Sequence, residues 1–75
     1  MDRIDWNYIQ NLPDRRPQLY ETIQLVAQGY DYKQIAKRRG VSPSTIKNSL
    51  SSFYTSTGIR NRAHLIHIAH EAGIL

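Results

Sequence analysis

The residues between Ser44 and Thr55 place short polar side chains on one side of a possible helix. With about 100° per residue, that side carries Ser44, Lys47, Asn48, Ser51 and Thr55, and Thr45 and Ser52 flank it. Hydroxyl, amide and ammonium groups exchange hydrogen bonds with base edges and phosphates, and short side chains let a helix approach the floor of a DNA major groove. The pattern therefore predicts contact with double-stranded DNA. The alternative is a serine-rich helix that only faces solvent.

Other kinds of site have little support in the sequence. Glu21 and Glu71 are isolated, and no nucleophile has a base at a recognisable spacing, so we expect no enzyme activity. His64, His67 and His70 recur at every third residue, but their directions spread over about 120° of a helix, and only Glu71 accompanies them. We therefore expect no catalytic residue, bound metal or cofactor, and interpret the histidines as surface or interface residues.

The charges of the chain are unevenly distributed along the sequence. The formal net charge is +4, and residues 32–70 contain no carboxylate. The same interval contains Lys33, Lys37, Arg38, Arg39, Lys47, Arg60 and Arg62. A run of charge is often only a solvated face, but a one-signed block of this length favours a polyanion as partner.

Length and composition limit the class of protein. A chain of 75 residues forms one small domain, which buries about 60% of the surface that the unfolded chain exposes. The chain has no cysteine, which excludes disulfides and thiolate metal sites. No apolar run exceeds three residues, which excludes a signal peptide and a membrane-spanning helix. We expect a cytoplasmic protein without a membrane partner.

Local signals predict helices only, and the first two occupy the middle of the chain. Apolar residues recur at helical spacing over residues 18–28, and Gly29 can end this helix in a left-handed conformation. Asp31 and Gln34 form the pattern of a capping box, which predicts a second helix of about eight residues that ends at Gly40.

Two further helices are expected in the second half of the chain. Ser42 is a suitable N-cap and is followed by Pro43, so a third helix should cover residues 43–57. Its buried stripe would consist of Ile46, Leu50 and Phe53. Asn61 is expected to cap a last helix that reaches about Ala72. The short glycine-containing sequence RGVS joins the second and third helices, as in a helix-turn-helix.

The chain from Glu21 to Leu75 also resembles the LuxR-type, or GerE-like, helix-turn-helix family. The motifs that carry the resemblance are QG at 28–29, KQIA at 33–36, VSPSTIK at 41–47, TGIRNR at 57–62 and the closing GIL. The resemblance implies an all-α fold of four helices that binds DNA. It also implies a sequence-specific transcription regulator with its recognition helix, residues 43–57, in the major groove.

The resemblance assigns roles to individual positions. It implies base contacts by Lys47, Asn48 and Ser51, and Ser44 is expected to join them because it shares their face. It implies phosphate contacts by Lys33, Lys37 and Thr45, and we expect the flanking Ser52 to do the same. The chain departs from the family pattern at residues 15–19, RRPQL, where a leucine-threonine and an arginine-glutamate pair are usual. Ser49 and Ser51 also replace larger residues, so the DNA sequence recognised cannot be transferred from relatives.

The last helix is expected to have two different sides. Leu65, Ile68, Ala69 and Ala72 share an arc that should pack against the other helices. Ala63, Ile66, His67 and His70 share the opposite, solvent-facing side. The resemblance implies that the last helix forms a homodimer, which would place two recognition helices about 34 Å apart on an inverted repeat.

We expect residues 1–16 to form an N-terminal extension to a DNA-binding domain of residues 17–75. The extension contains Ile4, Trp6, Tyr8, Ile9 and Leu12, and is too apolar for a disordered tail. We expect a short helix, capped by Asp2, that packs on the domain and buries Trp6. The alternative is a docking surface for another protein.

The length of the extension also bears on domain organisation. About sixteen residues leave no room for the receiver or ligand-binding domain that precedes this module in most relatives, so a stand-alone regulator is expected. A rival hypothesis is a small adaptor that binds RNA polymerase or another regulator through the fold and its aromatic extension.

Overall fold

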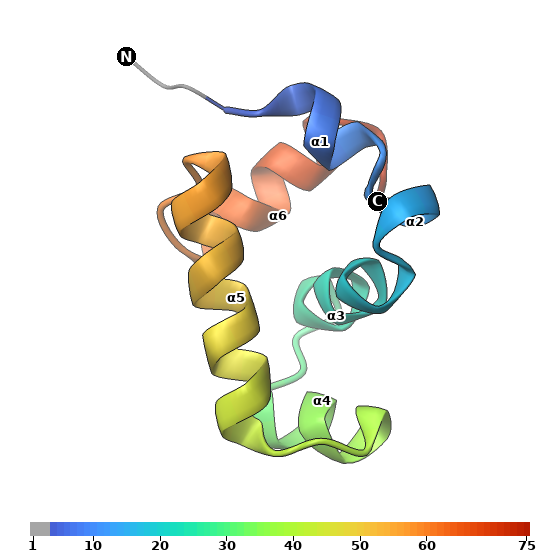
Figure 1. Cartoon of the computed structure of the whole chain (residues 1–75), viewed down its shortest axis with the longest axis vertical. Helices are drawn as coiled ribbons and strands as arrows, with labels where there is room; N and C mark the ends of the chain where they lie inside the picture. Colours follow the sequence, from blue (N-terminus) through green and yellow to red (C-terminus); the bar gives the residue numbers. More distant parts are fainter. Residues whose placement is uncertain (1–3) are drawn as a thin grey trace.

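The computed structural model describes residues 4–75, which form six α-helices and no strand (Figure 1). The helices are α1 (Trp6–Gln10), α2 (Leu12–Arg15), α3 (Pro17–Ala27), α4 (Tyr32–Arg39), α5 (Pro43–Thr57) and α6 (Arg62–Glu71). The four predicted helices correspond to α3, α4, α5 and α6, so the all-α prediction is confirmed. Two short helices precede them, where one was expected. None of the helices described is long and apolar enough to span a membrane.

The helix-turn-helix is formed by α4 and α5, and local hydrogen bonds define the ends of both helices. The Asp31 carboxylate accepts from the Gln34 backbone N–H at 2.8 Å, and the Gln34 side chain accepts from the Asp31 N–H at 3.0 Å. Gly40 ends α4 with a φ of 69°, a conformation that favours glycine. The Ser42 hydroxyl then accepts from the Thr45 N–H at 3.2 Å and begins α5. The predicted caps are therefore confirmed.

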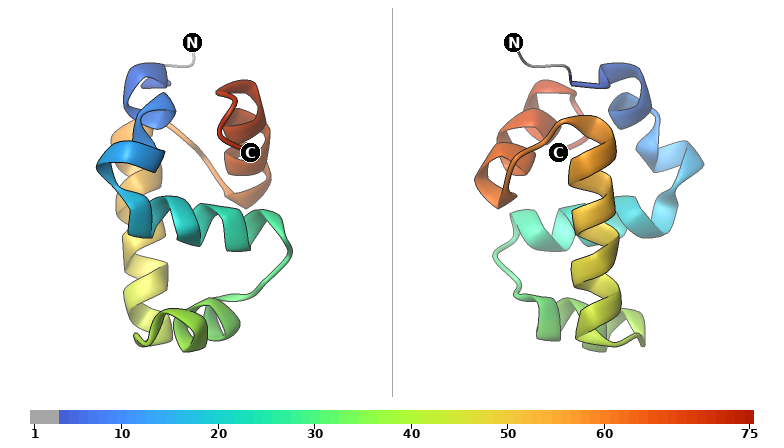
Figure 2. Two further views of the ribbon diagram at one scale, coloured as in Figure 1. Left: turned by 90° about the vertical axis from the view of Figure 1, so that its right-hand side faces the viewer. Right: turned by 60° about the vertical axis from the view of Figure 1, so that its left-hand side comes forward.

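The longest helix, α5, runs along the length of the molecule (Figures 1 and 2). The first turns of α5 lie near α4, its far end lies near α1 and α6, and α3 lies between these two groups. The overall extents are 34 × 22 × 20 Å. One side of α5 packs on the other helices, and its opposite side is exposed to solvent.

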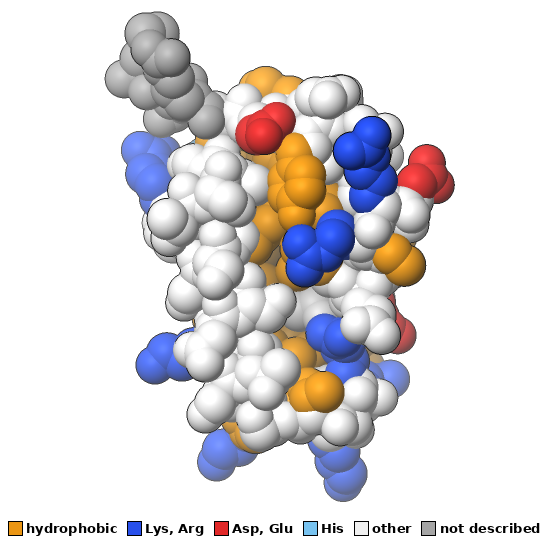
Figure 3. Space-filling model, in the orientation of Figure 1, with side chains coloured by type: hydrophobic (Ala, Val, Ile, Leu, Met, Phe, Trp, Pro, Cys, Tyr) orange, Lys and Arg blue, Asp and Glu red, His pale blue; other side chains and the backbone are white. Residues whose placement is uncertain are grey.

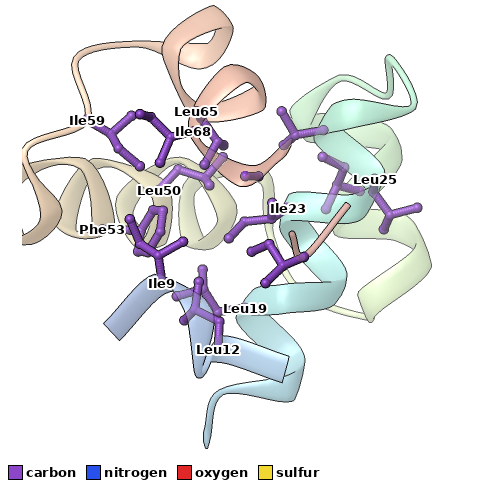
Figure 4. Close-up of a cluster of buried hydrophobic side chains, with 14 of the residues drawn as sticks. Ile9, Leu12, Leu19, Ile23, Leu25, Leu50, Phe53, Ile59, Leu65 and Ile68 are labelled. Carbon is purple, nitrogen blue, oxygen red and sulfur yellow. The ribbon is translucent and has the colours of Figure 1, made fainter. Parts of the chain in front are cut away.

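A single core connects all six helices, and much of it is drawn in Figure 4. Each helix contributes a side chain that is at most 1% exposed: Ile9, Leu12, Ile23, Ile35, Leu50 and Leu65, in chain order. Full burial of one such side chain contributes about 1.5–3 kcal/mol to stability. The described part of the extension, residues 4–16, therefore packs on the domain, as expected.

The residues that attach the extension differ from those expected. Trp6 is 40% exposed, while Ile9 and Leu12 are buried. The expectation that Trp6 is buried was wrong, because Trp6 is the first residue of a five-residue helix and lies beside the groove between α1 and α6. Asp5 caps α1 by accepting from the Tyr8 N–H at 3.2 Å. The predicted cap, Asp2, lies outside the described residues.

Candidate nucleic-acid interface

The exposed side of α5 is formed by the predicted polar residues. Ile46, Leu50 and Phe53 are 0%, 1% and 3% exposed and fix the orientation of the helix. As a result, the residues expected at base edges all face solvent: Ser44, Lys47, Asn48 and Ser51. The predicted orientation is confirmed, and the base contacts stay a prediction.

The flank of α5 carries the residues expected to contact phosphates, Thr45 and Ser52, and both are exposed. The Thr45 hydroxyl lies 2.9 Å from the Ser42 hydroxyl, and either group can donate. Thr45 therefore supports the N-cap of α5 and keeps hydrogen-bonding capacity for a phosphate, because a hydroxyl has one donor and two acceptor positions.

Lys33 and Lys37 lie one turn apart on α4, and both side chains are exposed. Ile35 and Ala36, on the opposite side of α4, are buried in the core. Within residues 4–75, neither lysine forms an ion pair with a carboxylate. Both ammonium groups are thus available to a polyanion, as expected for phosphate contacts.

Arg39 belongs to the core-facing side of α4 rather than to the exposed basic surface. Its guanidinium donates to the Thr22 hydroxyl at 2.8 Å, and its Nε lies 3.8 Å from a carboxylate oxygen of Glu21. The Arg39 side chain is only 13% exposed. Residues 15–19 lack the arginine-glutamate pair that is usual in the family. α3 nevertheless forms an ion pair, between its Glu21 and Arg39 of α4.

Arg62 also forms hydrogen bonds within the fold. It donates to the carbonyl oxygens of Val26 at 3.1 Å and Tyr30 at 3.0 Å, and so joins the beginning of α6 to the end of α3. Arg38, in contrast, remains exposed. Its guanidinium lies 4.4 Å from the centre of the Tyr30 ring and donates to the Tyr30 hydroxyl at 2.7 Å, and these two contacts hold it in position. The basic block of residues 32–70 is therefore only partly available to a polyanion.

The side of α6 expected to form a dimer is mostly exposed. Ala63, His67 and His70 face solvent. Ile66 was expected to face solvent but is half-buried and packs against the core. Asn61 caps α6, as predicted, by accepting from the His64 N–H at 2.9 Å.

The histidines of α6 do not converge. His67 lies 3.8 Å from the Glu71 carboxylate, one turn further along the helix. Across residues 4–75, histidine and acidic side chains form no group of three that could hold a metal ion.

Comparison with known proteins identifies the type of domain. A family model described as bacterial regulatory proteins, luxR family, matches residues 20–69. The match contains α4, α5 and most of α3 and α6, and leaves α1 and α2 outside.

Curated relatives that match the chain are named as HTH-type transcriptional regulators and come from Mycobacterium bovis and from two strains of Mycobacterium tuberculosis. Each is 36% identical over 53 residues, which are 71% of this chain and 6% of the relative. The chain thus spans a small part of the length of these relatives. No solved structure gives a significant match.

Proposed function

The chain belongs to the LuxR family of bacterial regulatory proteins, and we propose that it is a sequence-specific DNA-binding transcription regulator. The observation that carries this proposal is the exposed side of α5, on which polar side chains project from the second helix of a helix-turn-helix. The exposed lysines of α4, Lys33 and Lys37, belong to the same helix-turn-helix. Function therefore rests on recognition of DNA, rather than on catalysis or a cofactor.

In the proposed complex, α5 lies in the major groove. Its base contacts come from Ser44, Lys47, Asn48 and Ser51. Lysine suits the acceptors of guanine, and asparagine forms two hydrogen bonds with adenine. Phosphate contacts from Lys33, Lys37, Thr45 and Ser52 fix the position of the helix on the duplex.

We also propose that the protein acts as a homodimer through α6. Ala63, Ile66, His67 and His70 would face their symmetry mates, and the paired α5 helices would read an inverted repeat. Because Ile66 also packs on the core, Ala63→Glu is the cleaner test of this interface. Sedimentation should show a monomer for Ala63→Glu, and an unchanged dimer would exclude this face.

The proposed organisation is a DNA-binding domain of residues 17–75 with an extension of residues 1–16, and the proposed location is the cytoplasm. A rival function is suggested by Trp6, which is 40% exposed beside a groove of about 690 Å³ between α1 and α6. An adaptor would use this groove to bind RNA polymerase or another regulator. In that case, Trp6→Ala would abolish activity in cells and leave DNA binding intact.

A selection experiment tests the proposed function. The protein is mixed with genomic fragments, bound fragments are separated on a gel, and the retained DNA is sequenced. We expect a shared inverted repeat among the retained fragments. Retention of all sequences alike, or of none, would contradict sequence-specific DNA binding.

A further inference from the structure

A groove of about 370 Å³ separates α5 from the N-terminal extension. It is lined by Tyr8, Arg16, Leu19, Ser49, Ser52, Phe53 and Ser56. Figure 3 shows a strip of hydrophobic surface with uncharged surface over α5 on one side and Lys or Arg side chains on the other. None of the lining residues found within residues 4–75 is acidic.

The wall of the groove that α5 provides consists of serine hydroxyls. Ser49, Ser52 and Ser56 follow one another at helical spacing along the flank of α5. Ser56 donates to the Phe53 carbonyl at 3.2 Å, whereas Ser49 and Ser52 form no side-chain hydrogen bond with the rest of residues 4–75. Two hydroxyl groups on this wall are therefore available to an outside acceptor.

The opposite wall carries the Arg16 guanidinium, which is fixed in place. Arg16 donates to the Tyr8 hydroxyl at 3.0 Å. The Tyr8 ring in turn packs against Phe53 of α5, with the ring centres 6.3 Å apart. Because one guanidinium has five N–H donors, most of them remain free for a second acceptor. The extension thus presents a positioned cation next to α5.

We propose that this groove binds a phosphate of the DNA backbone, so that the extension is part of the DNA interface. A phosphate is recognised by a guanidinium together with hydroxyl donors, which are the groups on the two walls. Leu19 and Phe53 also line the groove, but they are only 4% and 3% exposed, so the contacts with a phosphate would come from the polar walls. This inference rests on the proposed function, because α5 must lie in the major groove for the backbone to pass its flank.

The larger groove, between α1 and α6, is a poorer site for DNA. It contains the Glu71 carboxylate, which repels phosphates, and its lining includes no residue of α5. Of the two grooves, only the smaller one combines a cation with free hydroxyls and shares a wall with the proposed recognition helix.

The experiment compares two variants of the full chain that lose the same charge. Arg16→Ala removes the groove cation, and Arg15→Ala removes the neighbouring exposed cation, which does not line the groove. Fluorescence anisotropy with one labelled duplex of random sequence, about 20 base pairs long, gives the affinity at several salt concentrations. Circular dichroism melting shows whether each variant is folded.

We expect Arg16→Ala to weaken binding by about tenfold and to reduce the log–log salt slope by about 0.9, the value for one phosphate contact. Arg15→Ala should weaken binding less and leave the slope unchanged. Tyr8→Phe keeps the ring against Phe53 but frees the guanidinium, so it should produce an intermediate loss.

Two outcomes separate this inference from the proposed function. If the wild-type chain binds the duplex and Arg16→Ala behaves as Arg15→Ala does, the groove does not hold a phosphate. If the wild-type chain binds neither this duplex nor any genomic fragment, the proposed function itself is overturned.

Discussion

The Tyr54 hydroxyl is buried and has no hydrogen-bond partner within residues 4–75. Burial raises the pKa of Tyr54, the neighbouring Tyr32 adds to this effect, and Arg62 acts in the opposite direction. A buried hydroxyl without a partner costs about 1–3 kcal/mol. Tyr54 therefore stabilises the fold through its ring and destabilises it through its oxygen.

Replacement of Tyr54 by phenylalanine should stabilise the protein. Removal of the hydroxyl should contribute about 1 kcal/mol, which corresponds to an increase in Tm of about 4–8 °C for a domain of this size. Wild-type stability should also fall above about pH 10, because Tyr54 then ionises more readily in the unfolded chain than in the fold. Tyr54→Phe should reduce that fall. A lower Tm for the variant would mean that the hydroxyl is hydrogen-bonded in solution.

Residue type alone could not separate the cations that serve the fold from those that face solvent. Lys33 and Arg39 look equivalent in the sequence, yet Arg39 binds Thr22 and Glu21 on another helix. Those contacts depend on how α3 and α4 pack, which no local pattern reveals. Arg16 was missed for a related reason, since its partner Tyr8 lies in a helix of the extension.

The Ser42 hydroxyl caps the first turn of α5. Ser42→Ala should lower stability by about 1 kcal/mol, because the Thr45 N–H loses the Ser42 hydroxyl as an acceptor. Ser44→Ala is a matched control, since the Ser44 side chain is exposed and makes no capping bond among the described residues. Urea unfolding measures both variants. Equal losses for the two would show that the cap does not stabilise α5.

The sequence predicted the ends of α4 and α5 well because the signals that define them are local. A cap such as Ser42 or the pair of Asp31 and Gln34 acts within three residues of the chain. The extension gave no such clear signal. Asn11 follows α1 directly and precedes α2, so two short helices replaced the single one expected.

The extension is attached to the rest of the molecule through buried aliphatic side chains. Ile9→Ala should lower the free energy of unfolding by about 2–5 kcal/mol, because it leaves a cavity at a site that is 1% exposed. Trp6→Ala should cost much less, because Trp6 is 40% exposed. Chemical denaturation distinguishes the two. A greater loss for Trp6→Ala would mean that the aromatic side chain anchors the extension.

From the sequence alone, Trp6 was expected to anchor the extension, because it is the largest apolar side chain there. In the fold it lies at the periphery instead. Which apolar residue of a short segment reaches the core is decided by the helices beneath it, here α3, α5 and α6. The same holds for the groove between the extension and α5, whose walls come from segments far apart in the chain. The exposed side of α5 could be predicted because its periodicity lies within one helix.

In the proposed complex, α5 contacts the bases and α4 contacts the DNA backbone, and two substitutions test this division directly. Asn48→Ala and Lys33→Ala are each titrated against the selected DNA site and against random DNA. We expect Asn48→Ala to cost about 1–3 kcal/mol at the selected site and little on random DNA, because an amide that contacts a base edge contributes only where that base is present. Lys33→Ala should weaken both complexes alike. Equal losses on the two DNAs for Asn48→Ala, or no loss on either, would contradict base recognition by α5.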